Sequence, residues 1–241
     1  MKALVLAGGR GNRLDELSAR RNKCMLLINN KPVIEYSLDC AVKTDVDEII
    51  IVVGYRAEEI INTYGNLYKN KQLKYVIQWE QRGLVNAIEC ARETLNGDDF
   101  MLMLGDEILM NPRHQAMIDE FKNGGLFGLC GVLLVDDRES IKRTYTLIQD
   151  GDNIIYRLVE KPRNPINDYM GTGDCVFKNA IYKYIEVTPI HHERKEKELP
   201  DLIQCAIDDG MLVKSFIVCD KYTNINTRED IEMGESFFTK T

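Results

Sequence analysis

Four short apolar runs separated by helical patterns constrain the fold of this chain more than any other feature. The runs lie at residues 2–7, 48–54, 73–78 and 100–104. Helices are expected between and after them, at 32–43, 56–64, 84–95 and 113–122, the first with Pro32 in its opening turn. Continuous apolar strands alternating with helices are typical of a parallel sheet that is covered on both faces. The first half therefore predicts a βαβ succession.

The pattern changes after Gly124-Gly125, where the apolar runs become longer. Strands are expected at about 126–135, 144–149, 153–160 and 174–178, and a helix, a strand and a final helix at 200–209, 212–218 and 229–238. Asp150-Gly151-Asp152 is typical of a hairpin turn, so this half is predicted to be antiparallel or mixed. Since there is neither an internal repeat nor a linker, the two halves are expected to share one sheet, in a single domain over residues 1–241.

The composition is that of an ordinary globular protein, with 241 residues of which 44% are hydrophobic and 29% charged. The apolar run at the start is too short for a signal peptide, and no later run approaches the roughly 20 residues that a membrane helix needs. These features predict a soluble, cytoplasmic protein with no membrane partner. The 7 cysteines contain no C-x-x-C pair and stand beside only 3 histidines, which argues against a disulfide framework or a zinc site.

The charge is unevenly distributed along the chain. The formal net charge of -7 argues against nucleic acid as a partner, because phosphate-backbone binding usually needs a basic domain. The first 23 residues nevertheless carry two acidic side chains, Asp15 and Glu16, against six basic ones: Lys2, Arg10, Arg13, Arg20, Arg21 and Lys23. A small cationic region around a glycine-rich loop suits a small polyphosphate better than a long polymer.

The strongest functional signal is the loop Leu6-Ala7-Gly8-Gly9-Arg10-Gly11-Asn12-Arg13-Leu14, which directly follows the first predicted strand. Glycines let the backbone pass close to a ligand and turn its N–H groups onto phosphate oxygens. Arg13 and Lys23 can supply positive charge to a leaving pyrophosphate. Glycines alone would fit a structural turn equally well, but the preceding strand and the two cations favour phosphate binding.

This loop resembles the signature segment of the sugar-1-phosphate nucleotidyltransferase family, which includes glucose-1-phosphate thymidylyltransferase and N-acetylglucosamine-1-phosphate uridyltransferase. The family pattern has Thr where Asn12 stands and Pro where Asn22 stands. The resemblance implies a Rossmann-like, three-layer nucleotidyltransferase fold with a mixed, mostly parallel central sheet. It also implies transfer of a nucleotidyl group from a nucleoside triphosphate to a sugar 1-phosphate, with release of pyrophosphate. Residues 1–124 would then bind the nucleotide and residues 125–241 the sugar phosphate.

A second segment, Gln78-Trp79-Glu80-Gln81-Arg82-Gly83-Leu84-Val85-Asn86-Ala87-Ile88, resembles the nucleobase-reading part of the family. An amide such as Gln78 offers a donor and an acceptor to a pyrimidine edge, and Gly83 lets the base lie against the backbone. UTP or dTTP is therefore the expected nucleotide. The nucleotide-binding residues implied by both segments are Leu6, Ala7, Gly8, Gly9, Gly11, Asn12, Arg13, Gln78 and Gly83.

Leu104-Gly105-Asp106 ends an apolar strand, the place where ligands of open α/β sheets gather. In the family this aspartate holds Mg²⁺, whereas Glu107 is expected to face solvent. The closing segment Tyr222-Thr223-Asn224-Ile225-Asn226-Thr227-Arg228-Glu229-Asp230 resembles the one in which relatives place a second metal ligand, commonly an acid, at the position of Asn224 or Asn226. Asp106 with one Asn oxygen can still suffice, because Mg²⁺ also binds substrate phosphates and water.

The sugar side is predicted from three further motifs in the second half. Tyr145, Glu160-Lys161-Pro162 and Gly171-Thr172-Gly173 resemble the family's sugar-phosphate pocket. By this resemblance, Glu160 accepts hydrogen bonds from sugar hydroxyls, Lys161 neutralises the attacking phosphate, and Thr172 and Gly173 contact the substrate. Glu198-Leu199-Pro200-Asp201 is expected to begin a helix beside the site. The predicted catalytic residues are Arg13, Lys23, Asp106 and Lys161.

Two other functions remain compatible with these motifs, and two fit them poorly. A cytidylyltransferase acting on phosphocholine or a phosphorylated polyol would share the loop and the aspartate, and the two amides at positions 224 and 226 leave open a non-catalytic nucleotide-sugar-binding protein. A dehydrogenase fits poorly, because the loop lacks the third glycine of G-x-G-x-x-G. A metal-dependent glycosyltransferase fits poorly too, because Gly105-Asp106-Glu107 is not a D-x-D motif. A homo-oligomer remains open.

Overall fold

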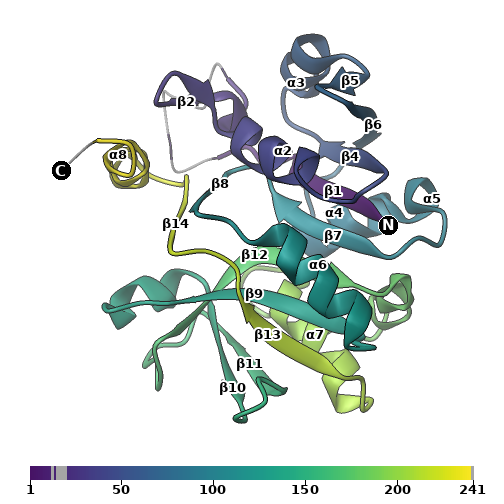
Figure 1. The fold of residues 1–241 in the computed structure, drawn as a ribbon, viewed down its shortest axis with the longest axis vertical. Coiled ribbons are helices and arrows are strands. Elements are labelled where there is room, and N and C mark those ends of the chain that lie inside the picture. Colours follow the sequence, from purple (N-terminus) through teal and green to yellow (C-terminus); the bar gives the residue numbers. More distant parts are fainter. Residues whose placement is uncertain (12–13, 15–20, 240–241) are drawn as a thin grey trace.

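A large mixed sheet forms the centre of the computed structural model, which describes residues 1–11, 14 and 21–239 (Figure 1). Within that part of the chain the sheet has eight strands. Their order from one edge to the other is β13 (Val213–Ile217), β9 (Gly128–Leu134), β12 (Tyr169–Phe177), β7 (Phe100–Leu104), β1 (Lys2–Ala7), β4 (Glu48–Val53), β6 (Lys71–Ile77) and β5 (Leu67–Tyr68).

The first half forms the parallel part of this sheet, as the apolar runs predict. Strands β7 and β4 flank β1 in parallel, and β6 continues beyond β4 in the same direction. The side chains of Ile49, Ile50 and Ile51 in β4 are fully buried. A strand that is buried on both faces needs apolar residues at successive positions, which is why these runs do not alternate with polar residues.

The second half extends the same sheet. Strand β12 runs antiparallel between β7 and β9, and β9 pairs in parallel with β13. The prediction that the two halves share a mixed sheet is therefore confirmed. Strand β12 begins several residues before the run at 174–178 and includes a register shift between Gly171 and Cys175.

Helices cover both faces of the sheet and make the structure three-layered. Their bounds are α2 (Ile34–Val42), α3 (Ala57–Tyr64), α4 (Leu84–Cys90), α5 (Arg92–Leu95), α6 (His114–Asn123), α7 (Leu199–Asp208) and α8 (Arg228–Ser236). One buried core includes residues of α2, α3 and α6, and a second core on the opposite face includes residues of α4, α5 and α7. The predicted three-layer α/β class is confirmed.

Two helical predictions differ from the structure at their boundaries. Pro32 lies in the short strand β3 (Lys31–Pro32) and not in a helix, because α2 begins at Ile34. The helix expected at 84–95 is split into α4 and α5 at Ala91, whose N–H donates to the carbonyl of Ile88 only three residues back. Such an i→i+3 bond tightens the last turn and ends the regular helix.

Small two-stranded sheets complete the fold. Strands β10 (Tyr145–Gln149) and β11 (Ile155–Glu160) form the hairpin expected around Asp150-Gly151-Asp152, and β2 (Leu27–Ile28) pairs with β3. Strand β8 (Glu107–Met110) pairs with β14 (Lys221–Asn224), and neither was predicted. The 3₁₀ helices are η2 (Lys23–Met25), η3 (Arg138–Arg143) and η4 (Asn179–Tyr184).

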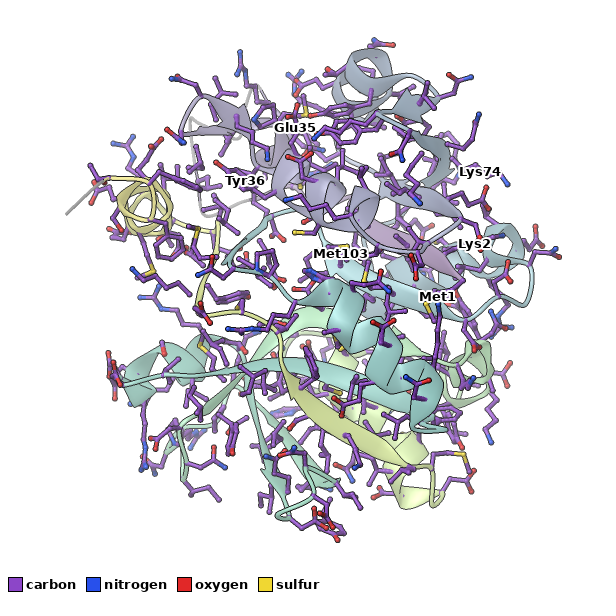
Figure 2. All side chains as sticks on the ribbon, viewed as in Figure 1. Met1, Lys2, Glu35, Tyr36, Lys74 and Met103 are labelled. Carbon is purple, nitrogen blue, oxygen red and sulfur yellow. The ribbon has the colours of Figure 1, made fainter. Side chains whose placement is uncertain are left out.

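An ion network satisfies charges at the start of the sheet. Lys2 of β1 is buried, and its ammonium lies 2.9 Å from Glu48 of β4 and 3.2 Å from Asp98. Glu48 also pairs with Lys74 of β6 at 2.8 Å. Figure 2 labels Lys2 and Lys74, which lie on the same side of the molecule in that view. A buried ammonium is costly unless it is paired and hydrogen-bonded, and this network provides those partners.

Among the described residues no helix is long and apolar enough to span a membrane.

Candidate nucleotide and sugar-phosphate site

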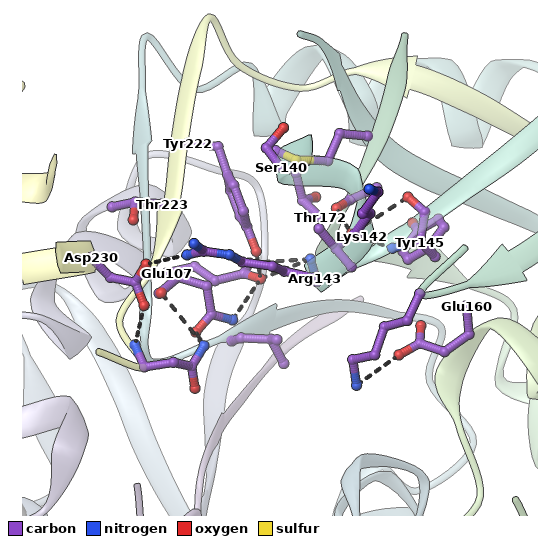
Figure 3. A pocket seen from close by; sticks show the side chains of 18 of the residues that line it. Glu107, Ser140, Lys142, Arg143, Tyr145, Glu160, Thr172, Tyr222, Thr223 and Asp230 are labelled. Carbon is purple, nitrogen blue, oxygen red and sulfur yellow. Dashed lines mark hydrogen bonds and ion pairs between the residues drawn. The ribbon is translucent and has the colours of Figure 1, made fainter. Parts of the chain in front are cut away.

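A cavity of about 720 Å³ opens between the β7–β8 turn, β12, η3 and the segment that leads from β14 into α8 (Figure 3). All five residues predicted to bind the sugar phosphate line it: Tyr145, Glu160, Lys161, Thr172 and Gly173. The two candidate metal-binding amides, Asn224 and Asn226, line it as well. Motifs that lie about 80 residues apart in the sequence are thus brought to one cavity.

Tyr145 packs against a glycine in the cavity wall. A Cβ atom added to Gly171 would lie 2.1 Å from the Tyr145 ring, far inside van der Waals contact. Thr144 hydrogen-bonds the Gly171 carbonyl through its hydroxyl at 2.5 Å, which holds β10 against β12 beside the ring. Gly171 is therefore a glycine because the tyrosine ring occupies the side-chain position. The ring forms a fixed wall of the cavity.

Glu160 and Lys161 form an ion pair beside Tyr145, because Tyr145 and Glu160 are paired residues of β10 and β11 (Figure 3). Their charged atoms are 3.1 Å apart. Burial raises the pKa of Glu160 and the Lys161 ammonium opposes that rise. Lys161 has a left-handed backbone (φ 44), and its N–H donates to the Thr144 carbonyl at 2.6 Å. This turn at the end of β11 directs a carboxylate and an ammonium into the same space.

The ammonium group of Lys23 lies between two side-chain oxygen atoms at the end of β7. The ammonium of Lys23, a residue only 8% exposed, contacts the Asp106 carboxylate and lies 3.2 Å from the Asn226 amide oxygen. The Asp106 carbonyl accepts a hydrogen bond from Ile225 N–H at 2.8 Å. That backbone bond fixes the segment around Asn226 against the turn that carries Asp106.

These oxygen atoms form a donor set that fits a hard divalent cation. A carboxylate and an amide oxygen converge on one positively charged group, and Mg²⁺ prefers oxygen ligands. The described residues contain no group of three His, Cys, Asp or Glu side chains placed to hold a metal. An ion bound here would therefore take most of its remaining ligands from phosphates and water.

Asn22, which stands where the family pattern has Pro, supports Lys23. It is fully buried, and its amide nitrogen donates to the carbonyls of Ala7 (3.2 Å) and Tyr55 (2.7 Å). Its amide oxygen accepts from Cys24 N–H at 2.9 Å and caps η2. The bonds join the end of β1 to the residue before Lys23, so Asn22 positions the lysine. Its place directly before a predicted catalytic lysine was the available signal.

The prediction that Glu107 faces solvent is wrong. Glu107 is only 2% exposed, and its carboxylate accepts hydrogen bonds from Gly173 N–H at 3.0 and 3.2 Å and from the Tyr222 hydroxyl at 2.6 Å (Figure 3). Burial, with the nearby Asp174 and Asp106 carboxylates, raises the pKa of Glu107 well above its usual range. Pairing of β8 with β14 turns this side chain inward, and its partners are too distant in sequence for local pattern to reveal them.

Gln78 is buried at the start of the segment expected to read the base. Its amide nitrogen donates to the Gly83 carbonyl at 3.2 Å and to the Asn86 side-chain oxygen at 2.9 Å. Gly83 has a left-handed backbone (φ 91), and a Cβ there would lie 2.5 Å from a carboxylate oxygen of Glu196. Both features require glycine at this position. Asn86, which the sequence did not single out, orients Gln78.

The glycine loop lies between Gln78 and Lys23. A Cβ at Gly8 would lie 2.9 Å from the Gln78 side-chain oxygen, and one at Gly11 would lie 3.1 Å from the Lys23 stem. The preceding residues Leu6 and Ala7 are buried, whereas Gly9 is exposed. Asn12 and Arg13, both predicted to bind the nucleotide, lie outside the described residues.

Comparison with known proteins identifies relatives along almost the whole chain. The model of the nucleotidyl transferase family matches residues 2–231. The low-salt glycan biosynthesis nucleotidyltransferase Agl11 of Haloferax volcanii is 30% identical over 233 residues, which are 96% of this chain and 64% of Agl11. The UTP–glucose-1-phosphate uridylyltransferase AglF of the same organism is 28% identical over 98% of this chain and 95% of its own length.

A solved structure shows the same fold. A UDP-glucose pyrophosphorylase in complex with UDP-glucose superimposes with a TM-score of 0.86 at 17% identity, over 98% of this chain and 97% of that one. The likeness at this identity concerns the fold. The lengths differ among relatives, since this chain spans about two thirds of Agl11 but nearly all of AglF.

The contact between Gly171 and Tyr145 generates a stability prediction. Gly171→Ala forces a methyl group into the ring, so it should lower the free energy of unfolding by about 1–3 kcal/mol, as overpacking typically does. Gly151→Ala is the matched control, because no atom lies within 4 Å of a Cβ at that turn. Both variants are compared with the wild type by urea unfolding. Equal stability of the two variants would contradict the packing described here.

Proposed function

Because the chain belongs to the nucleotidyl transferase family, we propose that it transfers a nucleotidyl group from a nucleoside triphosphate to a sugar 1-phosphate, forming a nucleotide sugar and releasing pyrophosphate. The family assignment made from the sequence motifs is confirmed. The observation that carries the proposal is the position of the cavity. Glu160, Lys161, Thr172 and Gly173 line it, and the cation site of Asp106 and Lys23 adjoins it through Asn226.

The reaction needs no covalent intermediate on the protein. A phosphate oxygen of the sugar phosphate attacks the α-phosphorus in line, and the bond from that phosphorus to the bridging oxygen of pyrophosphate breaks. The protein contributes positioning and stabilisation of charge. Lys23, with Arg13, would neutralise the triphosphate, and Lys161 would neutralise the attacking phosphate.

Magnesium belongs to this proposal. Asp106 and the Asn226 oxygen would hold the ion, because both already face one cationic group. When bound, Mg²⁺ supplies positive charge that stabilises the phosphate oxygens in the transition state. Lys23 would then contact the phosphates instead of these oxygens, since its ammonium now lies between Asp106 and Asn226, where the ion would bind.

The orientation of Gln78 supports a pyrimidine with a protonated N3. Its amide nitrogen is directed to Gly83 and Asn86, so its oxygen is directed toward Gly8 and the glycine loop. Uracil and thymine present an N3–H donor to such an acceptor, whereas N3 of cytosine is itself an acceptor. UTP or dTTP is therefore favoured over CTP, and the sugar nucleotidyltransferase over the cytidylyltransferase alternative.

The wider assignments follow from the same reaction. We treat residues 1–241 as one domain, with residues 1–124 binding the nucleotide and residues 125–241 binding the sugar phosphate. The reaction would take place in the cytoplasm. A non-catalytic nucleotide-sugar-binding protein is the rival that the amides at positions 224 and 226 favour, and it would release no pyrophosphate.

A coupled pyrophosphate assay tests the proposal directly. With glucose 1-phosphate and Mg²⁺, kcat/KM for UTP or dTTP should exceed that for ATP, GTP and CTP by about tenfold or more, because the wrong base leaves buried polar groups unpaired. Preference for a purine would refute the role of Gln78, and preference for CTP would support the cytidylyltransferase. Binding of UTP without pyrophosphate release from any of a panel of sugar 1-phosphates would favour the non-catalytic protein.

A second test separates the two substrate phosphates. Lys161→Ala removes one charge-assisted phosphate contact, worth about 1.5–3 kcal/mol, so it should raise KM for the sugar phosphate or lower kcat by roughly ten- to a hundredfold. The Kd for UTP, measured by calorimetry without sugar phosphate, should stay within about threefold. Lys178→Ala is the control, since the Lys178 side chain is similarly exposed (44% against 41% for Lys161) and its ammonium pairs with Asp99. If Lys161→Ala weakened UTP binding as strongly as Arg13→Ala does, the division into two halves would be wrong.

A further inference from the structure

Asn224 and Asn226 are amides at positions where relatives commonly carry a carboxylate. The two polar atoms of an amide differ, since the oxygen accepts hydrogen bonds and the nitrogen donates them. A carboxylate presents oxygen to a metal whichever way it is turned, whereas Asn presents either an oxygen or an NH₂ group. Only the oxygen can bind Mg²⁺. A metal site that includes Asn226 therefore needs a neighbour that fixes the orientation of its amide.

Glu107 is the fixed acceptor from which such an orientation can start. Gly173 N–H, which can only donate, is directed at both carboxylate oxygens, and the Tyr222 hydroxyl is directed at Oε1. The amide nitrogen of Asn224 also faces Oε1, at 3.5 Å. The Glu107 carboxylate thus draws the Asn224 nitrogen to one side.

The orientation passes from Asn224 to Asn226. With its nitrogen directed at Glu107, Asn224 presents its oxygen on the other side, where it accepts a hydrogen bond from the Asn226 amide nitrogen at 2.6 Å. The Asn226 nitrogen also faces the Asn224 carbonyl at 3.5 Å. The Asn226 oxygen is consequently directed at the Lys23 ammonium, which it approaches to 3.2 Å beside Asp106.

We propose that Glu107 is a positioning residue that acts through Asn224 to turn the Asn226 oxygen toward Asp106, where the two oxygens bind the divalent cation. The inference rests on the proposed function for the identity of that cation. It assigns the ligand role to Asn226 and an orienting role to Asn224. Glu107 does not bind the metal itself, and it acts on the site only through its hydrogen bonds.

Mn²⁺ binding to the whole chain, measured by electron paramagnetic resonance without nucleotide, tests the relay apart from turnover. Glu107→Gln replaces one acceptor oxygen with an NH₂ group, which can donate to the Asn224 oxygen and reverse both amides. The Kd for Mn²⁺ should then rise by about tenfold, the usual scale for loss of a partner that orients a metal ligand. Glu198→Gln is the control, because it alters another buried carboxylate of the cavity that lies outside the relay, and its Mn²⁺ Kd should stay within about threefold.

Rescue by Asn226→Asp distinguishes orientation from general damage. A carboxylate at position 226 has no wrong end, and the reversed relay lets Asn224 donate to it. Adding Glu107→Gln to Asn226→Asp should therefore raise the Mn²⁺ Kd less than about threefold. If Glu107 merely supported the fold, the same factor would be lost in both backgrounds, because independent effects add. Circular dichroism of each variant verifies folding.

Three results would overturn the inference: no Mn²⁺ binding by the wild type, an unchanged Mn²⁺ Kd in Glu107→Gln, or equal losses in the two backgrounds. Failure of the proposed function is recognised separately, because it appears as absence of pyrophosphate release while the Mn²⁺ measurements retain the pattern given above.

Discussion

The contact between Lys23 and Asp106 is the interaction on which the arrangement of the site depends. Parallel pairing of β1 with β7 in the register Leu6–Leu104 brings the glycine loop and the β7–β8 turn to one edge of the sheet. Lys23 returns to that edge because Asn22 is bonded to the end of β1, and Asn226 reaches it because Ile225 is bonded to the Asp106 carbonyl. Three separate parts of the chain therefore meet at the Lys23 ammonium, at the boundary between the two halves.

Acidic groups concentrate around this point, and each is balanced by a cation or by fixed donors. Asp174 follows Gly173 on β12, and its buried carboxylate lies 3.2 Å from His114 Nε2. Burial acts to lower the pKa of His114, but the Asp174 carboxylate outweighs it and raises that pKa to about 10. The buried Asp174 carboxylate thus favours the imidazolium form of His114 at neutral pH. Gly173 and Tyr222 donate hydrogen bonds to Glu107, and Lys23 contacts Asp106, so each of these buried carboxyl groups has a partner that offsets the cost of its burial.

Sequence reasoning was strongest where the signal is local. Short, uninterrupted runs rich in Ile and Val favour strands buried on both faces, so the parallel half was predictable, and the motif order was enough to identify the family. It failed where a residue's environment is made by distant partners. Glu107 faces inward because of Gly173 and Tyr222, 66 and 115 positions away. Asn86 and Asn22 gain their roles from contacts with Gln78 and Tyr55 that no periodicity reveals.

The most direct test of a shared cation site is the substitution Asp106→Asn, assayed for pyrophosphate release with UTP, glucose 1-phosphate and Mg²⁺. Among the described residues Asp106 is the one carboxylate assigned to the proposed site, so its loss should reduce turnover by about 100-fold or more. The fold should persist, because the Asp106 carbonyl, and not its side chain, anchors Ile225. Turnover close to that of the wild type in a folded Asp106→Asn variant would contradict the metal-binding role proposed for this residue.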